Sequence, residues 1–287
     1  MRFLVMSGGS CRGAFQTGCL KYLLNDLELQ YDGVCGISIG AINSAVLAQH
    51  RKDQPKEAFL ELENQWNNIS QEKVIKPWWP FGKLSSVWKQ SLFDSTPLTT
   101  WLEKDVDLKR IRASGRMIGV GAVSLVTNKY RMFTEKDDDL IKGVIASSSY
   151  PGFFIPVKIG DDIFSDGGLK KQVNLSDAIN LGADEIDMLV CNPPAEGSND
   201  PKLGNTIDVL GRTLSTLSNE LMEYNINTCI FYNKLVTAGL SEGKRYIKLN
   251  VLRPETSLIS DSMDFSHESY KRMFNIGYDL ARKNFKP

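Results

Sequence analysis

The sequence has few histidines, no excess of either charge, and no cysteine pair at the spacing of a metal site. Lysine plus arginine and aspartate plus glutamate number 34 each, so no overall field attracts nucleic acid or an anionic membrane. His50 and His267 are the two histidines, and the five cysteines form no CxxC pair. A zinc cluster is therefore not expected, and we expect no nucleic-acid partner.

The sequence also lacks the long apolar segments that target a chain to a membrane or anchor it there. Its first residues, MRFLVM, are too short for the apolar region of a signal peptide. No apolar run approaches the roughly 20 residues of a transmembrane helix. An odd number of cysteines fits free thiols in a reducing compartment. We therefore expect a cytoplasmic protein, with any membrane contact at its periphery.

The 287 residues have an ordinary globular composition and alternating strand and helix patterns. Hydrophobic residues make up 42% of the chain and charged residues 24%, which is enough apolar material for a sizeable core. Short apolar runs at 3–6, 34–37, 117–123 and 186–190 predict buried strands, with helices between them. This order favours a three-layer α/β/α fold with a mostly parallel central sheet. We expect a single domain over 1–287, largely helical in its C-terminal part.

The first of these strands runs into a glycine-rich loop, SGGSCRG, at residues 7–13. A P-loop requires a lysine and a hydroxyl after Gly13, where Ala14 and Phe15 stand. A dinucleotide fingerprint requires a glycine where Ser10 stands, and an acidic residue about 20 positions on, which is missing. The loop is therefore a poor site for a nucleotide phosphate. It is either a tight turn without a ligand or an anion site of another kind.

The second strand ends in the motif GISIG, with Ser38 at its centre. Between a strand and a helix, G-x-S-x-G is typical of a nucleophile elbow, which exposes the serine on a sharp turn. Gly36 and Gly40 leave room for that turn because they carry no side chains. Loops that follow neighbouring parallel strands meet at one edge of a sheet. Backbone N–H groups of Gly9, Ser10 and Ser38 are therefore expected to converge, as an oxyanion requires.

A nucleophilic serine needs a base, and the sequence offers two main candidates. The order Ser38, Asp166, His267 matches the Ser–Asp–His order of α/β-hydrolases, although those enzymes normally place several strands before the elbow. Asp166 lies just beyond a further strand predicted over 162–164, and Gly167 and Gly168 allow its carboxylate to point inwards. The other histidine, His50, follows the helix after the elbow and is expected to face solvent.

Together these residues resemble the motifs of the patatin-like phospholipase family. GGSCRG at residues 8–13 looks like the GGGx[RK]G oxyanion loop of that family, GISIG like its nucleophile elbow, and DGG from Asp166 like its catalytic Asp-Gly-[AG]. The segments LFDSTPLTTWL, ASSSYPGFFIPVKI and NLSDAINLGAD also look like family segments. The resemblance covers roughly residues 3–190, with the motifs in the family's order.

The resemblance implies a serine acyl-ester hydrolase of the phospholipase A or lipid acyl hydrolase type, without a metal or other cofactor. Ser38 would attack the ester carbonyl of a phospholipid or another acyl-ester lipid, Asp166 would accept its proton, and an acyl-enzyme would form. Backbone N–H groups of Gly8, Gly9 and Ser10 would hold the oxyanion. Supporting roles fall to Arg12, which would tie down the loop, and to Gly13, Gly36, Gly40, Gly167 and Gly168.

Ser10 departs from the family pattern, because the family usually has a third glycine at this place. A serine still supplies a backbone N–H, but it is strained if the position requires a positive φ. Either the loop keeps a conformation that is ordinary for an L-residue, or the oxyanion hole is imperfect.

Two further segments bear on access of the substrate. KPWWPFGKLSSVW, residues 76–88, places Trp78, Trp79 and Phe81 beside lysines, which suits a lid, a membrane contact or core packing. The helix predicted over 207–235 carries an apolar 3,4 repeat, which fits packing on the domain, dimerisation or a lipid-facing wall. The oligomeric state is left open.

Three functions remain open from the sequence. The leading one is a hydrolase with a Ser38–Asp166 dyad. The second is a triad hydrolase in which His267 is the base. The third is a catalytically inactive module that binds a lipid or a nucleotide through the glycine loop.

Overall fold

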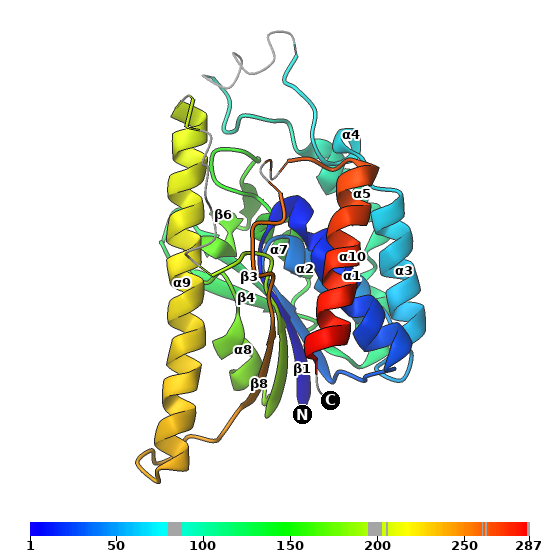
Figure 1. Ribbon diagram of the computed structural model, residues 1–287. Coiled ribbons are helices and arrows are strands. Elements are labelled where there is room, and N and C mark those ends of the chain that lie inside the picture. Colours follow the sequence, from blue (N-terminus) through cyan, green and yellow to red (C-terminus); the bar gives the residue numbers. More distant parts are fainter. Residues whose placement is uncertain (80–87, 195–202, 205, 260, 262, 286–287) are drawn as a thin grey trace.

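The computed structural model describes residues 1–79, 88–194, 203–204, 206–259, 261 and 263–285. Over this part of the chain, an eight-stranded sheet lies between two layers of helices (Figure 1). The strand order is β5-β6-β3-β2-β1-β7-β8, and β4 pairs with β3 beside this path. The predicted three-layer α/β/α fold class is confirmed.

The sheet is mostly parallel, as predicted. Its strands β3, β2, β1, β7 and β8 pair in parallel, whereas β4 and β6 pair antiparallel with β3, and β5 with β6. Their bounds are β1 Arg2–Met6, β2 Gly33–Gly36, β3 Met117–Ser124, β4 Tyr130–Thr134, β5 Val157–Ile159, β6 Asp162–Asp166, β7 Glu185–Leu189 and β8 Lys248–Leu252.

The central strand β1 is buried on both faces. Leu4 and Met6 belong to the hydrophobic core on one side of the sheet, and Phe3 and Val5 to the core on the other side. Successive side chains of a strand point to opposite faces. A strand that is covered by helices on both sides therefore reads as an unbroken apolar run, which is the pattern that identified it in the sequence.

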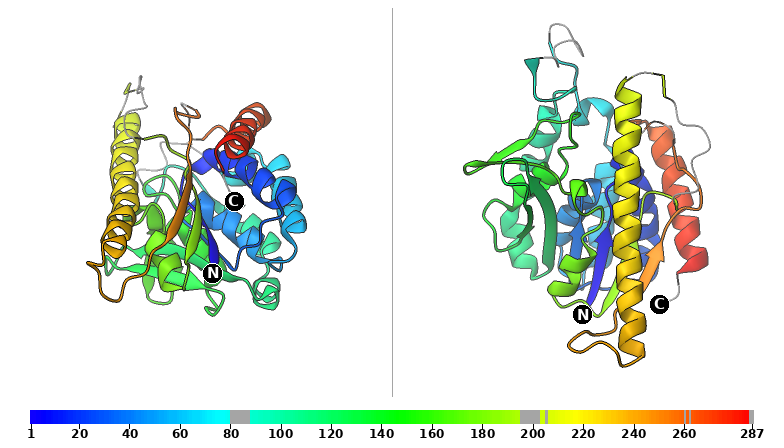
Figure 2. Two further views of the ribbon diagram at one scale, coloured as in Figure 1. Left: turned by 60° about the horizontal axis from the view of Figure 1, so that its bottom comes forward. Right: turned by 90° about the vertical axis from the view of Figure 1, so that its left-hand side faces the viewer.

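The helices fall into two layers (Figures 1 and 2). Side chains of α8 and α9 pack in one core, and those of α1, α2, α3, α5, α6, α7 and α10 in the other. The bounds are η1 Ser10–Arg12, α1 Gly13–Leu20, η2 Lys21–Asp26, α2 Ile39–Ala48, α3 Pro55–Asn67, α4 Gln71–Val74, α5 Thr96–Asp105, α6 Leu108–Ser114, α7 Leu140–Ser147, η4 Gly167–Leu169, α8 Leu175–Asn180, α9 Thr206–Thr237 and α10 His267–Asn284.

The 32-residue helix α9 stands along the outside of the molecule (Figure 2). Met222, Ile226 and Cys229 are buried against the sheet, whereas Leu217 and Tyr224 are exposed. The face that packs on the domain is therefore offset from the predicted 3,4 repeat, whose members Leu210, Leu217 and Tyr224 face solvent. No helix in the described part of the chain is long and apolar enough to cross a membrane.

The pairing of β3 brings the ends of two other strands together. β3 pairs with β2 up to Val120 and with β6 from Ala122 onward, while β4 overlaps both segments from the opposite side of β3. β6 therefore begins its pairing where β2 stops. Because β6 runs antiparallel, its last residue, Asp166, arrives just beyond Gly36, the last residue of β2. This is where the site forms.

Candidate active site

Ser38 lies on the short turn between β2 and α2. Its backbone has φ 56° and ψ −124°, a conformation that is strained for any residue with a side chain. Neighbouring groups hold it there. Its N–H donates to Oγ of Ser147 at 3.0 Å, and its carbonyl accepts from Oγ of Ser148 at 3.2 Å and from the N–H of Ala41 at 2.9 Å. The turn therefore exposes the hydroxyl while its main chain is fixed.

The glycines on either side of Ser38 are required by close approach. A Cβ on Gly36 would lie 2.0 Å from the carbonyl oxygen of Gly40, and one on Gly40 would lie 2.3 Å from that of Met6. Both contacts are with backbone, which cannot swing away as a side chain can. The sharp turn and its packing against β1 therefore exclude any larger residue at these two positions.

The glycine loop between β1 and α1 lies beside this turn. Within the described residues, the N–H groups of Gly9 and Ser10 have no acceptor. The N–H of Gly8 donates a long hydrogen bond to the carbonyl of Gln172 at 3.4 Å, and the role of Gly8 in holding the oxyanion stays a prediction. Ser10 takes a left-handed conformation with φ 54°. The position therefore does favour glycine, and the serine carries the strain.

Arg12 links the loop to the opposite side of the site. Its Nη1 donates to Oδ1 of Asn192, whose own amide donates to Oδ1 of Asn219 on α9 at 2.8 Å. Gly13 completes the loop, because a Cβ there would lie 2.3 Å from Cγ1 of Ile39 at the start of α2. The loop is therefore packed against the elbow and tied to the segment after β7.

Asp166 lies at the end of β6 and is 3% exposed. Burial raises the pKa of its carboxyl group to about 7, and hydrogen bonding from the N–H of Gly168 and from the Ser38 hydroxyl partly offsets this. Oδ1 accepts the Gly168 N–H at 2.7 Å, whereas Oδ2 has no well-formed hydrogen bond among the residues described. Gly167 permits the turn, since a Cβ there would lie 2.3 Å from the carbonyl oxygen of Gly121. The carboxylate is thus presented to Ser38 with one oxygen available.

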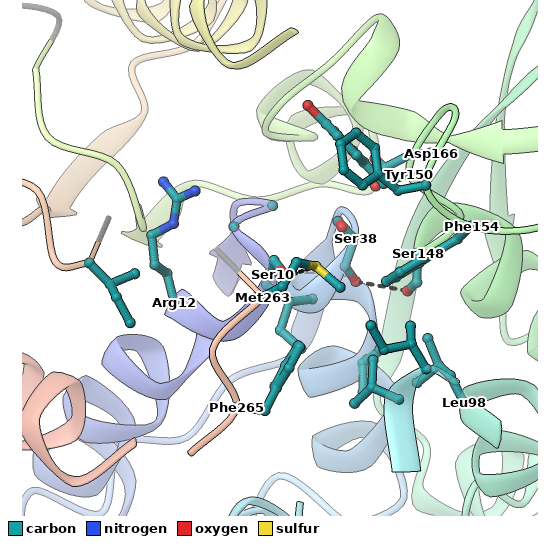
Figure 3. Close-up of a pocket in the computed structure, with 18 of the residues that line it drawn as sticks. Ser10, Arg12, Ser38, Leu98, Ser148, Tyr150, Phe154, Asp166, Met263 and Phe265 are labelled. Atoms are coloured by element: carbon teal, nitrogen blue, oxygen red, sulfur yellow. Dashed lines mark hydrogen bonds between the residues drawn. The ribbon is translucent and has the colours of Figure 1, made fainter. Parts of the chain in front are cut away.

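Ser38 and Asp166 line a cavity of about 990 Å³ (Figure 3). Ser10 lies beside Ser38, and Tyr150 lies over the carboxylate. The cavity continues between mainly apolar side chains, which include Ile42, Leu62, Trp66, Val74, Leu98, Trp101 and Phe154. A pocket of this size and lining suits an extended apolar ligand.

Neither histidine reaches the cavity. His267 is exposed at the start of α10, where its ring lies 6.0 Å from that of Tyr270. Nε2 of His50 lies 2.8 Å from Oε2 of Glu61, so this ring is paired where solvent exposure was expected. The described residues hold no group of three or more histidine, cysteine or acidic side chains placed to bind a metal ion. The geometry joins Ser38 to Asp166 alone.

The model of the patatin-like phospholipase family matches residues 4–179, more than half of the sequence. The chain belongs to this family. It is 26% identical over 203 residues to the calcium-independent phospholipase A2-gamma of Oryctolagus cuniculus, and 26% identical over 203 residues to that of Homo sapiens. Each match covers 59% of this chain and 24% of the relative, so the chain spans about a quarter of the length of these curated relatives. The family supports the predicted enzyme class, a hydrolase of ester bonds.

Among solved structures, the chain is similar to VipD from Legionella pneumophila, with a TM-score of 0.48 and 12% identity. The match covers 98% of this chain and 66% of VipD. It is also similar to the ExoU–SpcU complex of Pseudomonas aeruginosa, with a TM-score of 0.32, 17% identity, and coverage of 78% and 50%.

The predicted lid residues differ in their surroundings. Trp78 is half-buried, and its Nε1 donates to the carbonyl of Ser91 at 2.9 Å. Trp79 is 88% exposed, as is the nearby Trp88 at 81%. Phe81 lies outside the described residues. Trp78 therefore packs on the domain, and Trp79 projects into solvent.

Three polar residues that help to form the site were not predicted from the sequence. Ser147 and Ser148 end α7 and hold the main chain of Ser38. Gln172 lines the cavity between the glycine loop and Asp166. In the sequence, the run ASSSYPG is recognisable only as a family-like segment. Three serines at a helix end signal hydrogen bonding to a nearby main chain, but not which main chain.

Proposed function

We propose that the chain is a serine acyl-ester hydrolase, in which Ser38 is the nucleophile and Asp166 the general base. The observation that carries the proposal is that the two side chains come together in the lining of one cavity, part of which is apolar. Ser38 is exposed on a strained elbow, and the buried carboxyl group of Asp166 has a pKa raised to about 7. The substrate would be a phospholipid or another acyl-ester lipid, with its acyl chain in the cavity.

The reaction would proceed in two halves. Oγ of Ser38 attacks the ester carbonyl and passes its proton to Oδ2 of Asp166, and the N–H groups of Gly9 and Ser10 hold the resulting oxyanion. The tetrahedral intermediate expels the alcohol, which takes the proton from Asp166, and leaves an acyl-enzyme. A water molecule then gives a proton to Asp166 and attacks the acyl carbonyl. Ser38 leaves with that proton, and the free acid is released.

The environment of Asp166 supports its role as the base. An ordinary aspartate has a pKa of about 4 and is a weak base for a hydroxyl group. Burial raises the pKa of Asp166 to about 7, close to neutral pH, where a base combines ionisation with proton affinity. The oxygen without a well-formed hydrogen bond, Oδ2, is then the site that receives the proton.

The relatives support a lipid substrate. The proteins that match this chain are named calcium-independent phospholipases A2, and a Ser–Asp dyad needs no metal ion. We extend phospholipase A chemistry to this chain as part of the proposal. The exposed Trp79 and Trp88 lie beside Lys76 and Lys89, a combination that suits contact with a membrane surface. We propose peripheral binding from the cytoplasm.

A fluorophosphonate probe and a short p-nitrophenyl ester test the proposal. Wild-type protein should be labelled and should hydrolyse the ester, whereas Ser38→Ala should do neither while keeping its melting temperature. His267→Ala is the matched control and should keep full activity; its inactivity would support the triad. A folded wild-type protein that is not labelled would contradict the proposal and favour the inactive module.

Hydrolysis of two kinds of lipid then shows which class of ester the enzyme acts on. Vesicles of phosphatidylcholine and emulsions of triacylglycerol should be offered to wild type and to Ser38→Ala. Release of fatty acid from the vesicles by wild type alone is expected. If the vesicles yield none and the emulsion does, the enzyme is an acyl-ester hydrolase of neutral lipid.

A further inference from the structure

The three buried glutamines of the described chain differ in how their amides are satisfied. Gln16 donates to the carbonyl of Ser7 at 2.8 Å and accepts from Asn43 at 2.9 Å. Gln49 donates to the carbonyl of Asp105 at 3.3 Å and accepts from the main chain at 2.9 Å. Gln172 is 7% exposed, yet neither atom of its amide forms a hydrogen bond with a described residue. Neither amide atom of Gln172 is among the fully enclosed polar atoms that lack a partner, so the amide opens into the cavity, where it is free to bind a ligand.

The amide of Gln172 lies between the nucleophile and the base. A Cβ placed on Gly8 would lie 2.9 Å from Nε2 of Gln172 and 3.2 Å from Cβ of Ser38. A Cβ placed on Gly168 would lie 2.5 Å from Oε1 of Gln172 and 3.0 Å from Oδ1 of Asp166. Nε2 therefore faces the glycine loop and Ser38, and the side chain lines the cavity. Glycine at both positions makes room for this amide.

The main chain around Gln172 is held by its neighbours, which fixes the point from which its side chain enters the cavity. Nδ2 of Asn174 donates to the carbonyl of Gly119 at 2.8 Å, and Nζ of Lys171 lies 2.6 Å from Oδ1 of the buried Asp177. The carbonyl of Gln172 itself accepts the N–H of Gly8. A donor fixed in this way before the reaction is what stabilises a developing charge most strongly.

We propose that Nε2–H of Gln172 donates a hydrogen bond to the oxyanion of the tetrahedral intermediate, together with the N–H groups of Gly9 and Ser10. The main-chain carbonyl of Gln172 accepts the N–H of Gly8, and its side chain supplies another donor beside the glycine loop. The inference rests on the proposed function, because it needs an oxyanion formed at Ser38. Gln172 is then a catalytic residue, and the oxyanion hole extends beyond the glycine loop.

A pair of substitutions separates catalysis from folding. Gln172→Met keeps the length of the side chain and removes the donor. For a p-nitrophenyl ester we expect kcat to fall about 100-fold with KM within about twofold, and fluorophosphonate labelling to slow by a similar factor. Because no hydrogen bond to the protein is lost, the melting temperature should stay the same or rise. Gln49→Met is the control: it removes satisfied hydrogen bonds, so it should lower the melting temperature and leave kcat unchanged.

The pH profile distinguishes a donor from a residue that merely positions Asp166. Gln172→Met should keep the wild-type midpoint of kcat/KM against pH, since the carboxyl group is untouched. Wild-type kcat in this variant, or a loss accompanied by a shifted midpoint or a lowered melting temperature, would overturn the inference. Failure of the proposed function looks different, because the wild-type protein would then neither label nor turn over.

Discussion

The elbow at 36–40 and the glycine loop at 8–13 each place a serine at nearly the same positive φ but restrain the two serines very differently. Ser38 has φ 56° and Ser10 φ 54°, and such a conformation costs on the order of 1–3 kcal/mol for a residue with a side chain. Around Ser38, hydrogen bonds from two serine side chains and from α2 fix both sides of the residue. Surrounding structure therefore determines the elbow.

The glycine loop has weaker restraints at the corresponding place. The hydroxyl of Ser10 lies 3.8 Å from Sδ of Met263, a long contact with a poor acceptor, and its carbonyl accepts the N–H of Gly13. The difference follows from the two tasks. A nucleophile must meet both its base and the carbonyl carbon in one geometry, whereas each oxyanion donor has to meet a single atom. Ser38, whose position matters more for the reaction, is thus the more firmly restrained of the two serines.

The largest expected effect is on the chemistry at the elbow. Asp166→Asn removes the base while keeping the shape of the side chain, and ester hydrolysis should fall by about 10³-fold or more. In wild type, only the ionised carboxylate can accept a proton. Because the pKa of Asp166 is about 7, kcat/KM should fall about tenfold per pH unit below that value. A flat profile between pH 5 and 8 would argue against Asp166 as the base.

Asp166→Asn should lower activity, but it should raise the stability of the folded protein at alkaline pH. A carboxyl group whose pKa is raised on folding favours the folded state when protonated, and this contribution is lost as pH rises from about 4 to about 7. Asp166→Asn should therefore unfold at a higher temperature than wild type at pH 8. The difference should vanish below pH 4, which scanning calorimetry at the two pH values would check.

A matched pair of glycine substitutions tests whether the elbow is held more firmly than the glycine loop. In Gly40→Ala the new Cβ meets the carbonyl oxygen of Met6 at 2.3 Å, which is backbone, so the elbow cannot close. In Gly9→Ala it meets Cβ of Cys191 at 2.5 Å, which moves only with its own main chain; that main chain lies in the segment after β7, so it can shift more easily than a strand end. Gly40→Ala should lower the free energy of unfolding by roughly 3 kcal/mol or more, and Gly9→Ala by about half of that. Equal losses in urea titrations would contradict the comparison.

The sequence identified the elbow and the loop because both depend on local chemistry. Glycines that flank a serine between a strand and a helix have few other uses, and the central strands were clear because both faces are buried. The short helices α5 and α6 went unpredicted, since ten and seven residues carry too little periodicity to be distinguished from loops.

Other parts of the site depend on tertiary structure that a single sequence does not reveal. That Asp166 reaches Ser38 follows from β6 continuing the pairing of β3 beyond β2. The hydrogen bonds of Ser147 and Ser148 link residues more than 100 positions apart. The use of the Gly8 N–H by Gln172 is also long-range. Local patterns therefore named the candidate reacting groups, and the fold supplied the contacts that restrain them.

A smaller effect is expected when one restraint on the elbow is removed. Ser147→Ala deletes the acceptor of the Ser38 N–H and leaves a main-chain donor without its partner. The melting temperature should fall by an amount equivalent to about 1–2 kcal/mol, and kcat by about tenfold, because the hydroxyl of Ser38 loses its fixed direction. Ser114→Ala, remote from the site, is a suitable control and should leave kcat unchanged. A Ser147→Ala enzyme with wild-type kcat would show that the remaining bonds alone fix the elbow.

The smallest effect should come from relieving the strain at the loop. Ser10→Gly places at φ 54° the residue that adopts this conformation most readily. The hydroxyl it removes has only the long contact with Met263, so little is lost. The folded state should be stabilised by up to about 1 kcal/mol, less the extra freedom of glycine in the unfolded chain. The N–H remains, so kcat should stay within about twofold of wild type. A large loss of kcat with unchanged stability would show that the serine side chain itself orients the oxyanion donors, and that the loop is as closely specified as the elbow.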